Sequence, residues 1–398
     1  MTAFDSAHPL WEFTLVEHVD GDGAALVMKL HHSLTDGVGG MQLALELFDP
    51  TPDGPTPRAD PPPPAPEHLP RGALVRDGLV HDARELYRLA SRQARAALPA
   101  VLSAARHPVQ TRRDLIETVE SVGRMVAPVP EILSPVLVER GLTRELDMLT
   151  VPLEDLQRAA HAAGGTLNDA FVTAVTGGMR RYHERHDTEV RELRMMMPIS
   201  IRSATDPVVG NRITLPRFTV PVGEPDAAAR LREIAARCRL VRSERSLPYT
   251  NAIAGALNLL PHAVTGAMLK RVDFVASNVP GFREPMCLAG AEMTGYFPFG
   301  PTAGTALNVI LLSYRDTCCV GVTMDAAAVR DPDAWMTSLA EGFDEVLALG
   351  GRHRRPVWPL HVRARRREPV RSRRGPANLH RAPAGRDLRH APARRDDG

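Results

Sequence analysis

The sequence predicts an α/β protein with mixed sheets, and two observations lead to this fold class. Segments with the pattern of strands and segments with the pattern of helices follow one another along the second half, as in an α/β sandwich. The chain has 398 residues, of which 43% are hydrophobic, so it is long enough for two domains that each bury a core.

The first part of the chain is expected to form a hairpin, a helix and a linker. Residues 12–30 predict two strands around a turn of sequence Asp-Gly-Asp-Gly, and residues 38–48 predict a helix. The Pro-rich residues 49–72 predict an extended linker. Two further helices are expected over residues 73–105 and 111–126. The first is basic and amphipathic, which suits an anionic lipid surface, but a crossover helix packed on its own domain is the preferred interpretation.

The second half is expected to mix strands and helices. The strands are predicted over residues 145–152, 193–201, 212–221, 272–277, 288–295, 304–313 and 317–324. The helices are predicted over residues 153–163, 167–186, 226–245, 250–270 and 332–349. Residues 352–398 lack such periodicity and hold 15 arginines against 4 acidic residues, so they predict a disordered tail with no dedicated role.

The most specific motif is the stretch from His31 to Gly37, which reads His-His-Ser-Leu-Thr-Asp-Gly. It follows the apolar run of the second predicted strand and precedes the first predicted helix. Neutral imidazole can take a proton from a hydroxyl group and later return it to a leaving group, because its pKa lies near the working pH. One histidine of the motif, His32 in this interpretation, can therefore serve first as a base and then as an acid.

The other residues of the motif are expected to support the loop. Asp36 stands directly before the predicted helix and can cap its N-terminus. Gly37 is expected to provide a backbone conformation that the turn requires. His31 is expected to orient the loop rather than to act on the substrate.

The His-His-x-x-x-Asp-Gly pattern resembles the active-site motif of the superfamily that includes chloramphenicol acetyltransferase and peptide-synthetase condensation domains. Further stretches resemble, in order, signatures of one branch, the bacterial wax ester synthase/diacylglycerol acyltransferases. These stretches are Pro9-Leu10-Trp11, Thr166-Leu167-Asn168-Asp169-Ala170, Met197 to Arg202, Gly210-Asn211 and Ser277 to Gly281. Each is weak alone, but their order and spacing are specific, and the resemblance covers residues 8–349.

The resemblance implies two chloramphenicol acetyltransferase-like subdomains with mixed sheets. The first is expected to be incomplete, because the family carries further strands and helices before the Pro-Leu-Trp element. The implied parts are a remnant of the N-terminal subdomain with the His motif, a Pro-rich linker, a helical crossover, the C-terminal subdomain and an Arg- and Pro-rich disordered tail. In that order they span residues 1–48, 49–72, 73–144, 145–350 and 351–398.

The resemblance also implies roles for residues outside the motif. In the family, the Asp that matches Asp36 pairs with a distant Arg. Arg202, which ends a predicted strand, is the candidate partner, with a surface position as the alternative. Asn168 could donate a hydrogen bond to the oxyanion or, with Asp169, cap a helix and brace the site, and both interpretations stay open. Channel-wall positions are expected for Ser277 and Asn278.

The implied reaction moves a fatty acyl group from acyl-CoA to diacylglycerol or to a long-chain alcohol. Acyl-CoA is then a substrate, and we expect no cofactor, no metal and no specific nucleic acid. Neither a signal peptide nor an apolar run of membrane-spanning length is apparent. We therefore expect a cytoplasmic protein, either soluble or peripheral at the inner face of the plasma membrane or at lipid droplets. The four cysteines show no metal or disulfide spacing, and the adjacent Cys318 and Cys319 are expected to be buried thiols in a strand.

Two alternative functions remain open. A condensation-type acyl or peptidyl transferase shares the His motif, although the Pro-Leu-Trp and Asn-Asp stretches and the lack of a carrier domain argue against it. A catalytically inactive, truncated paralogue is the other alternative, since part of the first subdomain is expected to be missing.

Overall fold

The computed structural model describes residues 8–19, 23–54, 131–202, 213–244 and 271–357, with shorter runs and single residues before residue 22 and between residues 70 and 129. Several sequence predictions therefore lie outside the described residues. They are most of the linker over 49–72, the helical stretch over 250–270, the Gly210-Asn211 stretch and nearly all of the tail. Within the region between residues 72 and 123, most of the described residues are helical, as predicted.

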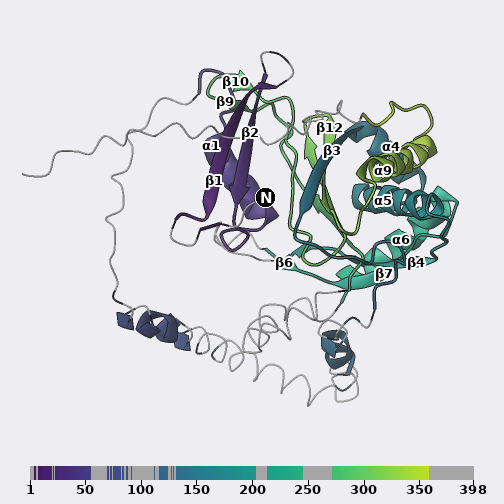
Figure 1. The fold of residues 1–398 in the computed structure, drawn as a ribbon, viewed down its shortest axis with the longest axis horizontal. Coiled ribbons are helices and arrows are strands. Elements are labelled where there is room, and N and C mark those ends of the chain that lie inside the picture. Colours follow the sequence, from purple (N-terminus) through teal and green to yellow (C-terminus); the bar gives the residue numbers. More distant parts are fainter. Residues whose placement is uncertain are drawn as a thin grey trace, which may run out of the picture. The chain divides into compact units, whose positions relative to one another are not determined.

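The hairpin and the first helix form as the sequence predicts (Figure 1). Strands β1 (Trp11–Val19) and β2 (Gly23–Leu30) pair antiparallel, with Trp11 opposite Leu30. Helix α1 (Gly37–Leu47) follows. The seven-residue His motif thus spans the connection from a strand to a helix.

A mixed six-stranded sheet forms the centre of the second half. The strand order is β3 (Arg144–Pro152), β12 (Thr317–Asp325), β11 (Leu307–Tyr314), β8 (Phe274–Val279), β4 (Glu192–Met196) and β7 (Arg217–Pro221). Strand β8 runs parallel to both of its neighbours, β11 and β4, and the other neighbouring strands pair antiparallel.

Two predicted strands are each divided by a proline. The segment predicted over 193–201 forms β4 and a separate β5 (Ile199–Ser200), with Pro198 between them. The segment predicted over 212–221 forms β6 (Ile213–Thr214) and β7, with Pro216 between them. Proline has no N–H to donate to a strand ladder, so both strands break at the same level and β5 pairs with β6 in a separate sheet.

The strand predicted over 288–295 is also shorter than expected. It forms a small antiparallel pair, β9 (Cys287–Leu288) and β10 (Ala291–Glu292). The two residues between them, Ala289 and Gly290, have φ angles of 49° and 83°. This left-handed backbone reverses the chain before a longer strand can form.

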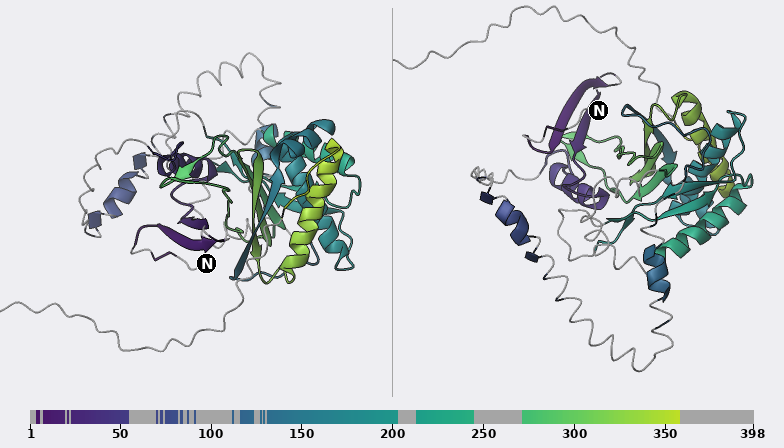
Figure 2. Two further views of the ribbon diagram at one scale, coloured as in Figure 1. Left: turned by 90° about the horizontal axis from the view of Figure 1, so that it is seen from above. Right: turned by 60° about the horizontal axis from the view of Figure 1, so that its bottom comes forward.

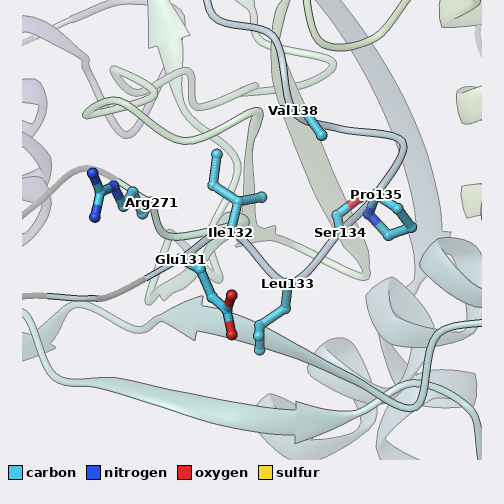
Figure 3. Close-up of a pocket in the computed structure, with 7 residues that line it drawn as sticks. All are labelled: Glu131, Ile132, Leu133, Ser134, Pro135, Val138 and Arg271. Atoms are coloured by element: carbon cyan, nitrogen blue, oxygen red, sulfur yellow. The ribbon is translucent and has the colours of Figure 1, made fainter.

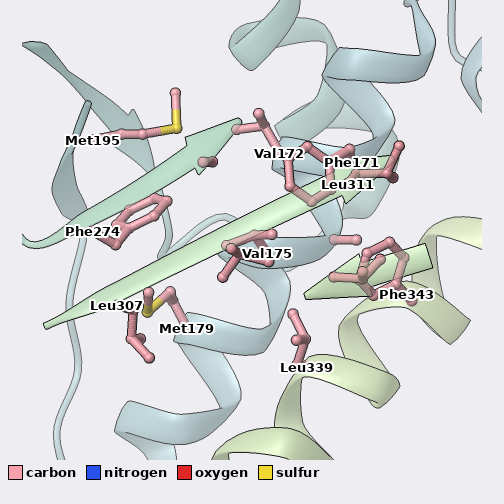
Figure 4. Packing of buried hydrophobic residues seen from close by; sticks show 14 of the residues in the cluster. Phe171, Val172, Val175, Met179, Met195, Phe274, Leu307, Leu311, Leu339 and Phe343 are labelled. Carbon is pink, nitrogen blue, oxygen red and sulfur yellow. The ribbon is translucent and has the colours of Figure 1, made fainter. Parts of the chain in front are cut away.

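Four helices cover one face of the six-stranded sheet (Figure 2). They are α4 (Leu153–Ala162), α5 (Leu167–Glu184), α6 (Ala227–Arg242) and α9 (Pro332–Leu347), the last continued by the short 3₁₀ helix η2 (Ala348–Gly350). Figure 4 shows their core, where Phe171 and Phe343 from the helices pack with Phe274, Leu307 and Leu311 from the sheet. Alternate residues of each strand point to this face, which fixes which residues point to the other.

The opposite face of the sheet carries α1. Met41 of α1 and its C-cap residue Phe48 form a hydrophobic cluster with Leu312, Tyr314 and Cys319 of β11 and β12. The backbone adds a bridge just beyond α1, where Asp49 exchanges hydrogen bonds with Cys287 at 2.8 and 2.7 Å. These contacts hold the helix that follows the His motif against the sheet.

Candidate active site

The two histidines of the motif lie at the end of the β1–β2 hairpin. The backbone N–H of His31 donates to the carbonyl oxygen of Leu10 at 2.9 Å, which continues the hairpin ladder to the first residue of the motif. Both His31 and His32 are exposed to solvent. An exposed imidazole at a strand end can meet a substrate, as a general base must.

The side chain of His31 is held by a near neighbour. Its Nδ1 atom lies 2.7 Å from the hydroxyl oxygen of Ser33, and the backbone N–H of Ser33 donates to the same nitrogen at 3.2 Å. The backbone of Leu34 then donates to the carbonyl of His31 at 3.0 Å and closes a tight turn. This arrangement agrees with an orienting role for His31.

Asp36 makes two bonds that together fix the loop. One carboxylate oxygen accepts a hydrogen bond from the backbone N–H of Gly39 at 2.8 Å, so Asp36 caps the N-terminus of α1. The other accepts from Nη2 of Arg202 at 2.8 Å. The two side chains are only 0% and 6% exposed, so this ion pair is largely desolvated.

Gly37 has a different role from the one expected from the sequence. It is not one of the glycines with positive φ, so the turn does not demand a glycine backbone conformation here. A Cβ atom at this position would instead lie 3.2 Å from Cγ2 of Val279. The loop thus closely approaches the side chain of Val279 at the end of β8.

The end of β8 therefore lines the His loop, and the two channel-wall candidates lie on opposite faces of it. Ser277 is opposite Ile310 in the parallel ladder and shares the face of Val279, which touches Gly37. Asn278 is opposite Leu311, a residue of the helix-side core. By strand alternation, Ser277 is on the face that carries α1, and Asn278 is on the face that carries the four helices.

Asn168 and Asp169 belong to a second group of residues at the start of α5. Asp169 accepts hydrogen bonds from the backbone and hydroxyl groups of Thr166 at 2.9 and 2.8 Å, which completes a capping box. The amide nitrogen of Asn168 faces Sδ of Met197 at 3.8 Å, beyond the end of β4. Asp169 also lies beside Cys238, whose thiol pKa is raised to about 12 by burial. These contacts favour the bracing interpretation of both residues.

The four cysteines are buried and free, as predicted for Cys318 and Cys319. Burial also raises the pKa of Cys318 to about 12, which makes this thiol a poor nucleophile. Among the described residues, no group of His, Cys, Asp and Glu is arranged to hold a metal ion. No helix in the described part of the chain is both long and apolar enough to cross a bilayer.

A surface pocket lies at the start of β8, whereas the motif meets the end of that strand. Figure 3 shows seven of its lining residues, which include Glu131, Ser134 and Arg271. Its volume is about 410 Å³, and no residue of the His motif lines it. The sequence alone predicts neither this pocket nor the approach of Val279 to Gly37, because each forms between segments that are distant in the chain.

The site is thus a strand-to-helix histidine loop that a buried ion pair ties to Arg202, just beyond β5. Residues 1–171 match the family described as the wax ester synthase/diacylglycerol acyltransferase catalytic domain, and residues 209–347 match its C-terminal domain. The chain belongs to the wax ester synthase/diacylglycerol acyltransferase family.

Individual relatives agree with this assignment. The chain is 35% identical over 351 residues to a protein of Mycobacterium tuberculosis H37Rv named as a candidate diacylglycerol O-acyltransferase, covering 87% of this chain and 71% of that protein. A second protein, from M. tuberculosis CDC 1551, is also named as a candidate diacylglycerol O-acyltransferase. It is 27% identical over 370 residues, and the match covers 87% of this chain and 75% of that protein. The fold is similar to that of a wax ester synthase/diacylglycerol acyltransferase from Marinobacter aquaeolei VT8. The TM-score is 0.55 at 22% identity, and the match covers 88% of this chain and 74% of that one.

Proposed function

We propose that this protein transfers a fatty acyl group from acyl-CoA to the hydroxyl group of diacylglycerol or of a long-chain alcohol, with His32 as the general base. The observation that carries the proposal is the buried Asp36–Arg202 ion pair. It ties the His loop to the strand that ends at Ser200, so the two histidines are presented from a fixed turn. A positioned base is what acyl transfer to an alcohol requires.

In the proposed reaction, the imidazole of His32 both takes up and returns the proton. His32 takes the proton of the acceptor hydroxyl while its oxygen attacks the thioester carbonyl carbon. A C–O bond forms, the C–S bond breaks, and the imidazolium of His32 returns the proton to the departing CoA thiolate. The charge and atoms balance without a cofactor or a metal, so none is part of the proposal.

The acceptor suggests where the protein works. Diacylglycerols and long-chain alcohols partition into lipid, so we place the enzyme at the inner face of the plasma membrane or at lipid droplets, as a peripheral protein. The hairpin and α1 expose several apolar side chains, among them Trp11, Leu15 and Leu45, which are 54%, 59% and 52% exposed. Side chains of this kind suit a site that receives lipid from such a surface.

The test is acceptor-dependent release of CoA from palmitoyl-CoA, with dipalmitoylglycerol or hexadecanol as acceptor. His32→Ala should lower kcat by a factor of about 10² to 10⁴, the usual contribution of a general base. The matched control is His161→Ala, which removes an exposed histidine of α4 whose Nδ1 bonds the carbonyl of Gln157. This control should keep the activity of the unsubstituted protein.

Three results would count against the proposal. A folded protein that releases no CoA with either acceptor would favour the inactive alternative. Equal activity of the His32→Ala and unsubstituted proteins would remove His32 from the mechanism. Faster transfer from palmitoyl-carrier protein than from palmitoyl-CoA would favour a condensation-type enzyme.

A further inference from the structure

We propose that Ser33 is a positioning residue that holds His31 in the tautomer with its proton on Nε2. His31 is then a hydrogen-bond donor and not a second base beside His32. The kinetic consequence of this inference rests on the proposed acyltransferase function. The assignment of the tautomer does not.

The argument begins with the backbone N–H of Ser33. This group can only donate a hydrogen bond, and it lies 3.2 Å from Nδ1 of His31 in bonding geometry. Nδ1 must therefore present its lone pair, because a proton on Nδ1 would face the proton of the Ser33 amide. A neutral imidazole carries one ring proton, so the proton of His31 is on Nε2.

The hydroxyl group of Ser33 reinforces the same assignment. Its oxygen lies 2.7 Å from Nδ1, the shorter of the two contacts. Since Nδ1 is an acceptor, the hydroxyl is the donor of this bond. The only lone pair of the neutral His31 ring is thus engaged twice by one neighbouring residue, and it is not available to take a proton from a substrate hydroxyl.

The rest of His31 is held as well, although its side chain is exposed. Its backbone N–H donates to Leu10, and its carbonyl accepts from Leu34. The ring also meets the ring of Phe4 edge to face, with centroids 5.8 Å apart. The backbone N–H and carbonyl groups of His31 are therefore both held, and the contacts of Ser33 determine which ring nitrogen carries the proton.

Two substitutions separate the contributions of Ser33. Ser33→Ala keeps the backbone N–H and removes the hydroxyl, whereas Ser33→Thr keeps both donors. The matched control is Ser243→Ala, which removes a hydroxyl that donates to the carbonyl of Leu240 at the end of α6. All variants are made in the full chain, and circular dichroism and melting curves check that each one folds.

The first readout is independent of activity. Long-range ¹H–¹⁵N spectra of ¹⁵N-histidine-labelled protein at about pH 8.5, where imidazoles are neutral, report which ring nitrogen carries the proton. The resonances of His31 are identified by their loss in a His31→Asn variant. We expect a protonated Nε2 and an unprotonated, hydrogen-bonded Nδ1. The Nδ1 resonance should move in Ser33→Ala, return in Ser33→Thr and stay in place in Ser243→Ala.

The second readout is kinetic. Ser33→Ala should lower kcat about two- to twelvefold with little change in KM, the loss expected for one neutral hydrogen bond, and Ser33→Thr should restore kcat. A proton on Nδ1 of His31, or an Nδ1 resonance unmoved in Ser33→Ala, would overturn the inference. An unchanged kcat would overturn the role of Ser33 in the reaction. Absence of any transfer by the unsubstituted chain would instead count against the proposed function, and the spectra would still decide the tautomer.

Discussion

The region that carries the His motif and the region that braces it are packed very differently. In the hairpin and α1, residues 8–54, Trp11 and Leu15 are more than half exposed. In the six-stranded sheet and its helices, the large side chains of Trp335, Phe274 and Phe343 are fully buried. The residues proposed to do the chemistry thus lie in the less buried region.

This difference assigns separate tasks to the two regions. An exposed loop can meet a lipid substrate, but exposed side chains bury little surface and so contribute little to stability. The position of the loop must then come from its contacts with the sheet region. The contacts nearest to the histidines are the ion pair of Asp36 with Arg202 and the approach of Gly37 to Val279.

The largest expected effect on stability compares a tryptophan from each region. Trp335→Ala empties a fully buried site where the indole meets the ring of Tyr182 at 5.8 Å, so we expect a loss of about 3–5 kcal/mol in the free energy of unfolding. Trp11→Ala is the matched control, because its ring is 54% exposed and touches Phe13. We expect it to cost less than about 1 kcal/mol. Urea unfolding of both variants makes the comparison, and equal losses would contradict it.

A smaller effect is expected where the two regions meet. Arg202→Ala leaves the buried carboxylate of Asp36 without its cation, and such a loss costs up to about 3–5 kcal/mol. We expect a value below that of Trp335→Ala, because the loop can move and let water reach Asp36. Acyl transfer should fall together with stability. The matched control, Arg315→Ala, breaks an ion pair with Glu292 that is about half exposed and should cost less than about 1 kcal/mol.

A double-mutant cycle tests whether the ion pair itself is responsible. Asp36→Asn keeps an oxygen that can cap α1 and removes the charge. If the pair matters, Asp36→Asn combined with Arg202→Ala should destabilise the protein by less than the sum of the two single variants. Simple additivity would mean that Arg202 acts on stability through other contacts.

Sequence patterns predicted the parts of both regions that depend on near neighbours in the chain. The hairpin of β1 and β2 and the cap formed by Asp36 are local features, and the structure has them. Breaks at Pro198 and Pro216 were missed, because the apolar pattern continues through both prolines and only the missing N–H interrupts the ladder.

Contacts between distant segments required the three-dimensional structure. Arg202 was a candidate partner of Asp36 only through a family resemblance, since 165 intervening residues leave no local signal. The different faces of Ser277 and Asn278 follow from the register of β8 with β11, which the sequence does not state. The approach of Val279 to Gly37 likewise depends on the fold and has no local signal in the sequence.

The smallest effect expected is a pH dependence of stability that originates in the sheet region. His183 is fully buried, its Nδ1–H donates to the carbonyl of Met179 at 2.7 Å, and its Nε2 accepts from the hydroxyl of Ser134 at 2.8 Å. Burial, with a smaller contribution from His186, lowers the pKa of His183. The unfolded chain therefore binds a proton near pH 6.5, where the folded protein does not.

The sign of this dependence follows from the lowered pKa. The stabilisation that the neutral, buried imidazole of His183 contributes is fully present above about pH 6.5. It is lost as the pH falls toward the folded-state pKa of His183. Between pH 7.5 and 5, His183→Gln should thus lose less stability than the unsubstituted protein in urea titrations. His353, whose pKa is raised by the carbonyl of Gly351 and by Asp344, acts in the opposite direction, so each variant is compared at the same pH. If His183→Gln kept the full acid dependence, the buried imidazole of His183 would not be its source.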